Sequence, residues 1–264
     1  MTDGKRQRTA LVTGGAVRIG RAIAIGLAED GYDVAFVYRS SGDAALETVA
    51  AVEALGRRCA PIQADLSAAT AADEVAHELR ARLGADGDPF RLDVLVNSAA
   101  SFRQLPLMDV DAGEWDSVMA LNVRAPHLLT RACADMLRAA SGCIVNITDL
   151  SAFQAWTVYP HHAVSKAALA HLTRVQARAL APDVRVNAIA PGAVLPPDDW
   201  SEERWQALAE RAVLGTVGSP DDVLQAVRYL ISADFVTGHV LPVDGGRLLG
   251  PKGPPDAGGS PEPE

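Results

Sequence analysis

The sequence predicts a doubly wound α/β domain, in which a mostly parallel seven-stranded sheet carries helices on both faces. Short apolar runs alternate along the chain with longer segments whose apolar residues recur at helical spacing. Most of these runs are apolar on both faces, which is typical of parallel strands buried on both sides. The pattern continues without an internal repeat or a break in composition, so we expect residues 1–249 to form a single domain.

The first unit consists of an apolar run, a glycine turn and a helix. Residues 10–12 are apolar and end at Thr13-Gly14-Gly15. Beyond the turn, Ile19, Ile23 and Leu27 fall on one helical face. A strand, a tight glycine turn and a helix in this order open a Rossmann-type fold.

The remaining elements follow from the same two patterns. Apolar runs predict strands at residues 33–38, 59–63, 92–97, 142–148, 184–189 and 239–243. Helical spacing predicts helices at about residues 43–55, 69–83, 114–140, 161–180 and 221–231. Gly56 and Gly84 stop the helices before them, and Ser219-Pro220 is a favourable start for the last helix.

Composition and charge exclude several function classes. A net charge of -9 argues against a general nucleic-acid binder, and no segment approaches the length of a transmembrane helix. The three cysteines show no metal-ligand spacing, so we expect no metal site and a reducing, cytoplasmic location. The segment 250–264 is rich in proline, glycine and acidic residues, and we expect it to be disordered.

The glycine turn is a candidate anion site. The first backbone N–H groups of a helix lack internal partners, and the helix dipole is positive there. Gly14 and Gly20 would let the backbone approach a pyrophosphate without a Cβ in the way. The alternative is an ordinary glycine-rich turn between a strand and a helix. Arg18 stands where a second phosphate-facing glycine is expected.

The end of the second strand favours NADP(H) over NAD(H). In this architecture that position meets the adenosine ribose, where an acidic residue favours a free 2′-hydroxyl and a basic residue favours a 2′-phosphate. Here the strand ends in Tyr38-Arg39-Ser40, without an acid. A guanidinium pairs well with phosphate oxygens, although a solvated loop arginine is the simpler alternative.

In combination, several motifs resemble the short-chain dehydrogenase/reductase family over almost the whole chain to about residue 249. They are Thr13-Gly14…Gly20, Asp65-Leu66, Asn97-Ser98-Ala99, Leu121-Asn122-Val123, Ser165-Lys166, Pro191-Gly192 and Val243-Asp244-Gly245-Gly246. The resemblance implies a homotetramer formed through the helices around 114–140 and 161–180. It also implies cofactor contacts at Gly14, Arg18, Ile19, Gly20, Tyr38, Arg39, Ser40, Asp65, Leu66, Asn97, Ser98, Ala99, Thr148, Lys166, Pro191, Gly192 and Val194.

Within that family, the chain is most similar to the pteridine reductases. Arg18 replaces a glycine of most relatives, and Arg39-Ser40 ends the second strand. Phe102 resembles a phenylalanine that stacks on the pterin, and Asp149 stands where most relatives place a catalytic serine. Ala100 departs from the serine that some members carry.

The catalytic pair of the family, Tyr-x-x-x-Lys, is altered in this chain. Lys166 matches the lysine, which holds the nicotinamide ribose, but His162 stands in the place of the tyrosine. An imidazole can donate a proton near neutral pH, and a neighbouring ammonium would keep it mostly neutral. Tyr159 is a weaker candidate for the lost hydroxyl. The alternative is that His162 marks a weakened or inactive site.

Three further residues complete the expected site. Asp149 would supply or relay a proton to a ring nitrogen, which requires burial to raise its pKa, and its alternative role is a helix cap or turn before Ser151. Asn122 resembles the family asparagine that kinks its helix and holds a water leading to the lysine. Phe102 and Arg18 are expected to contact the substrate, with Arg18 reaching across the cofactor phosphates.

These features lead to three hypotheses. The first is an NADPH-dependent reductase that transfers a hydride to a pterin-type heterocycle, a dihydropterin or dihydrofolate. The second is a general NADPH-dependent carbonyl reductase of the same family. The third is an NADP-binding protein without catalysis, which acts as a sensor or scaffold.

Overall fold

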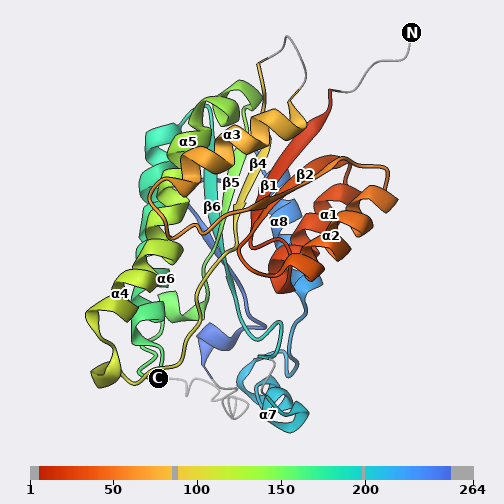
Figure 1. The fold of residues 1–264 in the computed structure, drawn as a ribbon. Helices are drawn as coiled ribbons and strands as arrows, with labels where there is room; N and C mark the ends of the chain where they lie inside the picture. Colours follow the sequence, from red (N-terminus) through yellow and green to blue (C-terminus); the bar gives the residue numbers. More distant parts are fainter. Residues whose placement is uncertain (1–5, 85–88, 198–199, 251–264) are drawn as a thin grey trace, which may run out of the picture.

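Seven parallel strands form one sheet in the order β3-β2-β1-β4-β5-β6-β7, shown in Figure 1. The computed structural model describes residues 6–84, 89–197 and 200–250. The strands are β1 (Arg8–Thr13), β2 (Tyr32–Tyr38), β3 (Cys59–Gln63), β4 (Val94–Asn97), β5 (Cys143–Ile147), β6 (Arg185–Pro191) and β7 (Val240–Val243). The chain reverses its direction of winding between β3 and β4, which confirms the doubly wound fold.

Helices cover both faces of the sheet (Figure 1). On one face lie α1 (Arg18–Glu29), α2 (Gly42–Ala54) and α8 (Pro220–Ser232). On the other lie α3 (Ala71–Leu83), α5 (Ala125–Ala140) and α6 (Pro160–Leu180), while the short helices α4 (Ala112–Met119) and α7 (Glu202–Gln206) lie toward one end. Each face encloses its own apolar cluster, one around Phe36 and Leu27 and the other around Leu79 and Leu129.

Most element boundaries agree with the sequence prediction to within two residues. The predicted helix 114–140 is interrupted by five residues of π-helix, Ala120–Arg124, between α4 and α5. This wider turn contains Asn122, which is buried. The predicted tail 250–264 lies outside the described residues apart from Gly250.

No helix in the described ranges is long and apolar enough to cross a membrane.

Candidate active site

The predicted cofactor residues lie where the parallel strands end. Carboxyl ends of parallel strands meet at one edge of the sheet, and ligands of such folds bind there. The positions end or follow β1 (Gly14, Arg18, Ile19, Gly20), β2 (Tyr38, Arg39, Ser40), β3 (Asp65, Leu66), β4 (Asn97, Ser98, Ala99), β5 (Thr148) and β6 (Pro191, Gly192, Val194), and Tyr38, Asn97 and Pro191 are the last residues of their strands. Thr13 joins two of these turns, because its hydroxyl accepts hydrogen bonds from the backbone N–H groups of Ser98 (2.9 Å) and Ala99 (3.0 Å).

The turn after β1 leaves no room for larger residues. A Cβ on Gly20 would lie 2.2 Å from the carbonyl oxygen of Gly14. Gly14 itself has a φ of +69°, and its N–H donates to the carbonyl oxygen of Val37 (2.8 Å). The glycines are therefore needed to fold the turn upon itself.

The amino end of α1 is suited to an anion. Its N-cap residue, Val17, offers no side-chain hydrogen bond, and no acidic residue occupies the first turn. The positive end of the helix dipole is thus left without a counter-charge from its own first turn.

Arg18 connects this turn to the segment after β6. It adopts a φ of +54°, the left-handed region in which a glycine would be the less strained residue. Its guanidinium donates to the carbonyl oxygens of Pro196 (3.0 Å) and Leu195 (3.5 Å). The side chain therefore extends from the β1 turn to the opposite loop.

The end of β2 presents an exposed cation. Arg39 forms no side-chain hydrogen bond or ion pair within the described residues. Two hydrogen bonds from Ser67 hold the pKa of the neighbouring Asp65 below its ordinary value, and the charge of Arg39 contributes in the same direction. A guanidinium at this position is available to an anionic ligand.

Asp149 and His162 form a hydrogen-bonded pair at the end of β5. His162 comes from the first turn of α6, and its Nε2 contacts Oδ2 of Asp149. The other carboxylate oxygen accepts hydrogen bonds from the backbone N–H (2.7 Å) and the hydroxyl of Ser151. The capping role of Asp149 and its contact with His162 therefore coexist.

Nδ1 of His162 is placed to donate a hydrogen bond to a backbone carbonyl. This nitrogen lies 2.8 Å from the carbonyl oxygen of Ser101, which can only accept a hydrogen bond. The contact between Nε2 and the Asp149 carboxyl requires one further proton, since two lone pairs would otherwise face each other. A pair in which Nδ1 is the donor therefore shares one proton between Nε2 and Oδ2.

The pKa of Asp149 is lowered from its ordinary value. Burial acts to raise it, but the hydrogen bond and charge of His162, assisted by the charge of Lys166, outweigh burial. The proton-donating role expected of Asp149 required a raised pKa, and the net direction is the opposite because the partners of Asp149 outweigh its burial.

Lys166 lies one turn beyond His162 on α6 and is fully enclosed. Its ammonium group donates to the carbonyl oxygen of Ile147 (2.8 Å). Burial lowers its pKa, and the carboxylate of Asp149 partly opposes that effect. Lys166 and His162 thus lie on the same stretch of helix facing the end of β5, as the spacing of four predicts.

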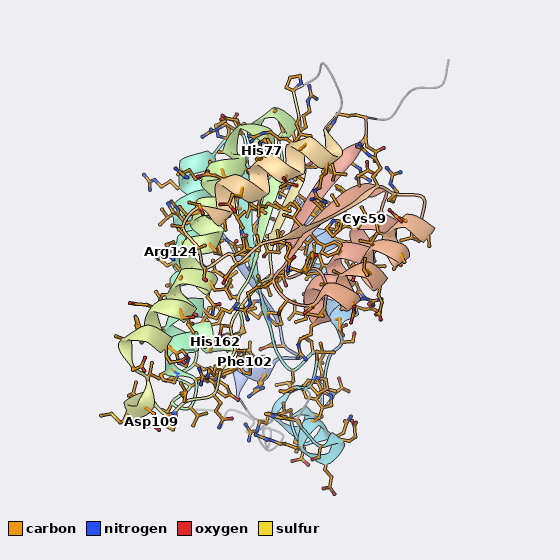
Figure 2. All side chains as sticks on the ribbon, viewed as in Figure 1. Cys59, His77, Phe102, Asp109, Arg124 and His162 are labelled. Carbon is orange, nitrogen blue, oxygen red and sulfur yellow. The ribbon has the colours of Figure 1, made fainter. Side chains whose placement is uncertain are left out.

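Aromatic side chains flank the pair. Figure 2 shows Phe102 and His162 close together near the end of the sheet. The edge of one ring meets the face of the other at a centroid distance of 4.8 Å, and Phe102 also stacks on Tyr159 at 4.4 Å. Tyr159 shares a hydrogen bond with the side chain of Gln104 (3.2 Å) and forms none with Lys166 among the contacts described.

Three serines hold the site, and the sequence analysis did not predict the contacts of Ser101 and Ser165. Ser101 provides the carbonyl for His162, Ser151 binds Asp149, and Ser165 connects His162 to Asn122. The turn between Asp149 and Ser151 was expected from the sequence as an alternative role for Asp149, and the structure contains it. The other two depend on contacts between distant segments.

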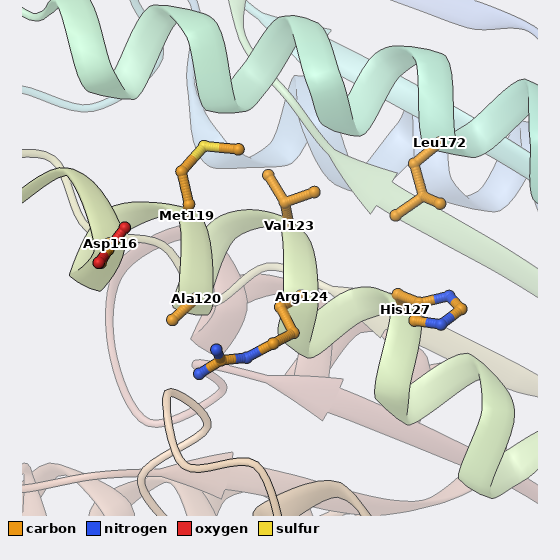
Figure 3. Close-up of a pocket in the computed structure, with 7 residues that line it drawn as sticks. All are labelled: Asp116, Met119, Ala120, Val123, Arg124, His127 and Leu172. Carbon is orange, nitrogen blue, oxygen red and sulfur yellow. The ribbon is translucent and has the colours of Figure 1, made fainter.

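Two other features lie apart from this pair. His161 is buried, and both of its ring nitrogens lack a hydrogen-bond partner within the described residues. A hollow of about 560 Å³ lies along the π-helical turn and α6, lined by Asp116, Met119, Ala120, Val123, Arg124, His127 and Leu172 (Figure 3). None of the predicted catalytic residues lines it.

Comparison with known proteins identifies similar dehydrogenases and reductases. Residues 15–247 match the family described as enoyl-(acyl carrier protein) reductase. The 3-oxoacyl-(acyl-carrier-protein) reductase FabG of Staphylococcus aureus is 33% identical over 251 residues, which are 93% of this chain and 100% of that protein. The 3beta-hydroxysteroid dehydrogenase 1 of Eggerthella lenta is 33% identical over 260 residues, covering 95% and 97% of the two chains.

Solved structures of similar proteins include complexes with a nicotinamide cofactor. A short chain dehydrogenase from Burkholderia cenocepacia in complex with NADP has a TM-score of 0.84 at 35% identity, covering 91% of this chain and 98% of that chain. A blue fluorescent protein from a metagenomic library in complex with NADPH has a TM-score of 0.82 at 36% identity, covering 91% and 97%.

Proposed function

The chain belongs to the short-chain dehydrogenase/reductase family, and from that premise we propose that it is an NADPH-dependent reductase of a pterin-type substrate. The substrate is a dihydropterin or a dihydrofolate. The observation that carries the proposal is the Asp149–His162 pair, which places a proton source beside the exposed ring of Phe102.

Three observations support NADP(H) as the cofactor. The uncapped amino end of α1 suits a pyrophosphate, and the exposed guanidinium of Arg39 suits a 2′-phosphate. Similar proteins have been solved with NADP or NADPH bound. When bound, this cofactor would supply the hydride, and Lys166 and Thr148 would lie on its nicotinamide side.

The proton would leave through Asp149. Its side chain is 19% exposed, whereas that of His162 is 3% exposed, so a substrate reaches the carboxyl and not the imidazole. Reduction of a ring C=N bond adds a hydride to carbon and a proton to nitrogen. The Nε2 proton of His162 passes to Oδ2 of Asp149 and from there to the substrate nitrogen, and solvent then returns a proton to Nε2 through the partly exposed carboxyl of Asp149.

A flat heterocycle is supported by the surroundings of the pair. Phe102 is 50% exposed, and Arg18 extends to the loop at residues 195–196 that lies across the end of the sheet. A ring that stacks on the exposed part of Phe102 would lie beside the Asp149–His162 pair.

A general carbonyl reductase is the second candidate. It is favoured by the relatives, which are named for 3-oxoacyl and 3-hydroxysteroid substrates. The paired Asp149 and His162 could equally protonate a carbonyl oxygen. A silenced NADP-binding protein is the third candidate, because the family tyrosine is replaced by His162.

A substrate screen distinguishes the candidates. NADPH oxidation is followed by the loss of its absorbance with dihydropterins, dihydrofolate and a set of ketones. We expect turnover with a dihydropterin. Turnover of ketones alone would replace the first candidate by the second, and no turnover despite tight NADPH binding would favour the third.

We also propose that the chain forms a homotetramer through α4–α5 and α6. Exposed apolar side chains on α6, including Val164 and Val175, support it, as does the hollow beside the π-helical turn (Figure 3). Light scattering of the purified chain should give four times the mass of one chain. A monomer would contradict this proposal and leave the proposed activity untouched.

A further inference from the structure

Asn122 lies on the π-helical turn and binds a backbone segment 21 residues earlier. Its Oδ1 accepts a hydrogen bond from the N–H of Ser101 (2.9 Å). Its Nδ2 donates to the carbonyl oxygen of Ser101 (3.3 Å) and to the hydroxyl of Ser165 (2.9 Å). The amide oxygen and the amide nitrogen of Asn122 are thus both hydrogen-bonded to Ser101 or Ser165, which fixes the orientation of the amide.

The carbonyl oxygen of Ser101 is thereby saturated. It has two lone pairs, one of which accepts from Asn122 and the other from Nδ1 of His162. Because the oxygen cannot donate, a bare Nδ1 would face it with a second lone pair. His162 is 2% exposed, so water cannot relieve that repulsion at low cost.

The position of the carbonyl therefore decides which ring nitrogen is permanently protonated. In water an imidazole exchanges its proton between two nitrogens, and a neutral ring that donates from Nε2 to a carboxylate would be the ordinary arrangement beside Asp149. In that arrangement the imidazole is neutral and its single N–H already donates to the carboxylate, so the pair holds no additional proton for a substrate. When Nδ1 carries its hydrogen, Nε2 forms a hydrogen bond with the Asp149 carboxylate only when the pair holds one further proton.

We propose that Asn122 is a positioning residue, which holds the Ser101 carbonyl against Nδ1 of His162. In this way Asn122 keeps the transferable proton between His162 and Asp149. The role extends the proposed reduction and rests on it for its catalytic consequence. The protonation pattern itself is a property of the chain without substrate. Ser165 supports the arrangement, since its hydroxyl donates to the carbonyl oxygen of His162 (2.7 Å) and accepts from Asn122.

The test reads the ring of His162 directly. Full-length chain labelled with ¹⁵N in histidine is studied by NMR, and the signals of His162 are assigned by their absence in His162→Phe. We expect the wild-type Nδ1 to be protonated throughout the pH range in which the chain is folded. An unprotonated Nδ1 in the wild type would overturn the proposal without recourse to any variant.

Asn122→Ala removes the support of the carbonyl. We expect its spectrum to show a population with the proton on Nε2 and none on Nδ1, and we expect kcat for the reduction to fall while KM for NADPH stays unchanged. A spectrum identical to that of the wild type would contradict the role of Asn122. If no substrate is reduced by any form, the NMR result still decides the inference, and the proposed function fails separately.

Asn187 provides a matched control. It is also 1% exposed and also holds backbone, since its Nδ2 donates to the carbonyl oxygen of Val236 (2.8 Å) and its Oδ1 accepts from the N–H of His239 (3.0 Å). Asn187→Ala loses comparable hydrogen bonds and should cost comparable stability. We expect it to leave the His162 spectrum unchanged, and an equal change in both variants would reduce the effect to general loosening of the fold.

Discussion

Replacement of Arg39 by alanine should distinguish the two nicotinamide cofactors. The guanidinium lies at the end of β2, is exposed, and has no ion-pair partner within the described residues. A charge-assisted hydrogen bond to a phosphate contributes about 1.5–3 kcal/mol. Because water screens an exposed guanidinium, we take the lower part of that range, about 1.5–2 kcal/mol.

At about 1.4 kcal/mol for each factor of ten, Arg39→Ala should weaken NADPH binding by roughly 10- to 30-fold. NADH lacks the 2′-phosphate, so its Kd should change less than about twofold. Isothermal titration of both cofactors into both forms of the chain provides the measurement. Arg138→Ala is the control, because Arg138 is a similarly exposed arginine on α5, paired with Asp135 and remote from β2.

The salt dependence of binding provides a second reading of the same contact. An exposed ionic contact is screened by salt, so the advantage of NADPH over NADH should shrink as the ionic strength rises. Equal weakening of NADPH and NADH in Arg39→Ala would refute the reasoning, because the residue would then support the fold of the loop and not the phosphate.

Three other predictions concern the pair and the turn. His162→Phe should lower kcat by roughly 10²–10⁴-fold, the usual contribution of a positioned acid, while His162→Tyr should retain more activity. Stopped-flow measurement of NADPH oxidation tests both variants. Wild-type activity in His162→Phe would show that the imidazole takes no part in the reaction. Gly20→Ala should lower the melting temperature by several degrees, corresponding to about 1–3 kcal/mol, because its Cβ would overlap the Gly14 carbonyl, whereas Gly42→Ala meets no atom within 4 Å and should not. The lowered pKa of Asp149 stabilises the fold above about pH 4, the ordinary aspartate value, and this contribution is lost as the pH falls through the lower pKa of the folded state. Asp149→Asn lacks that contribution, so its stability should fall less steeply with pH during acid denaturation than that of the wild type. Equal steepness in the two forms would contradict the coupling.

The sequence was sufficient for the seven strands and the long helices because each of them carries a local signal, whereas the short helix α7 was not predicted. The buried strands are short apolar runs, while glycines mark the ends of helices and a proline marks the start of the last one. The π-helical turn at residues 120–124 was not predictable in this way. Its sequence has ordinary helical spacing, and its contacts lie with Ser101, far away in the chain.

The residues of the candidate site could be named from the sequence, but the contacts between them could not be predicted. Asp149, His162, Lys166 and Asn122 were each named as candidates through the resemblance of their positions to motifs of the family. Considered alone, a buried carboxyl is expected to have a raised pKa, and the contact with His162 reverses that direction. The direct donor role expected for His162 also depends on exposure, which sequence patterns do not give, and the structure turns its two nitrogens toward Ser101 and Asp149.

The most direct test of the account is the rate of hydride transfer in Asp149→Asn. An asparagine keeps the shape and the capping of Ser151 but cannot pass a proton from His162 to a substrate. In single-turnover oxidation of NADPH by a dihydropterin, the account predicts a loss of roughly 10²-fold or more in rate with an unchanged Kd for NADPH. A variant that transfers the hydride within about twofold of the wild-type rate would contradict the claim that this pair supplies the proton.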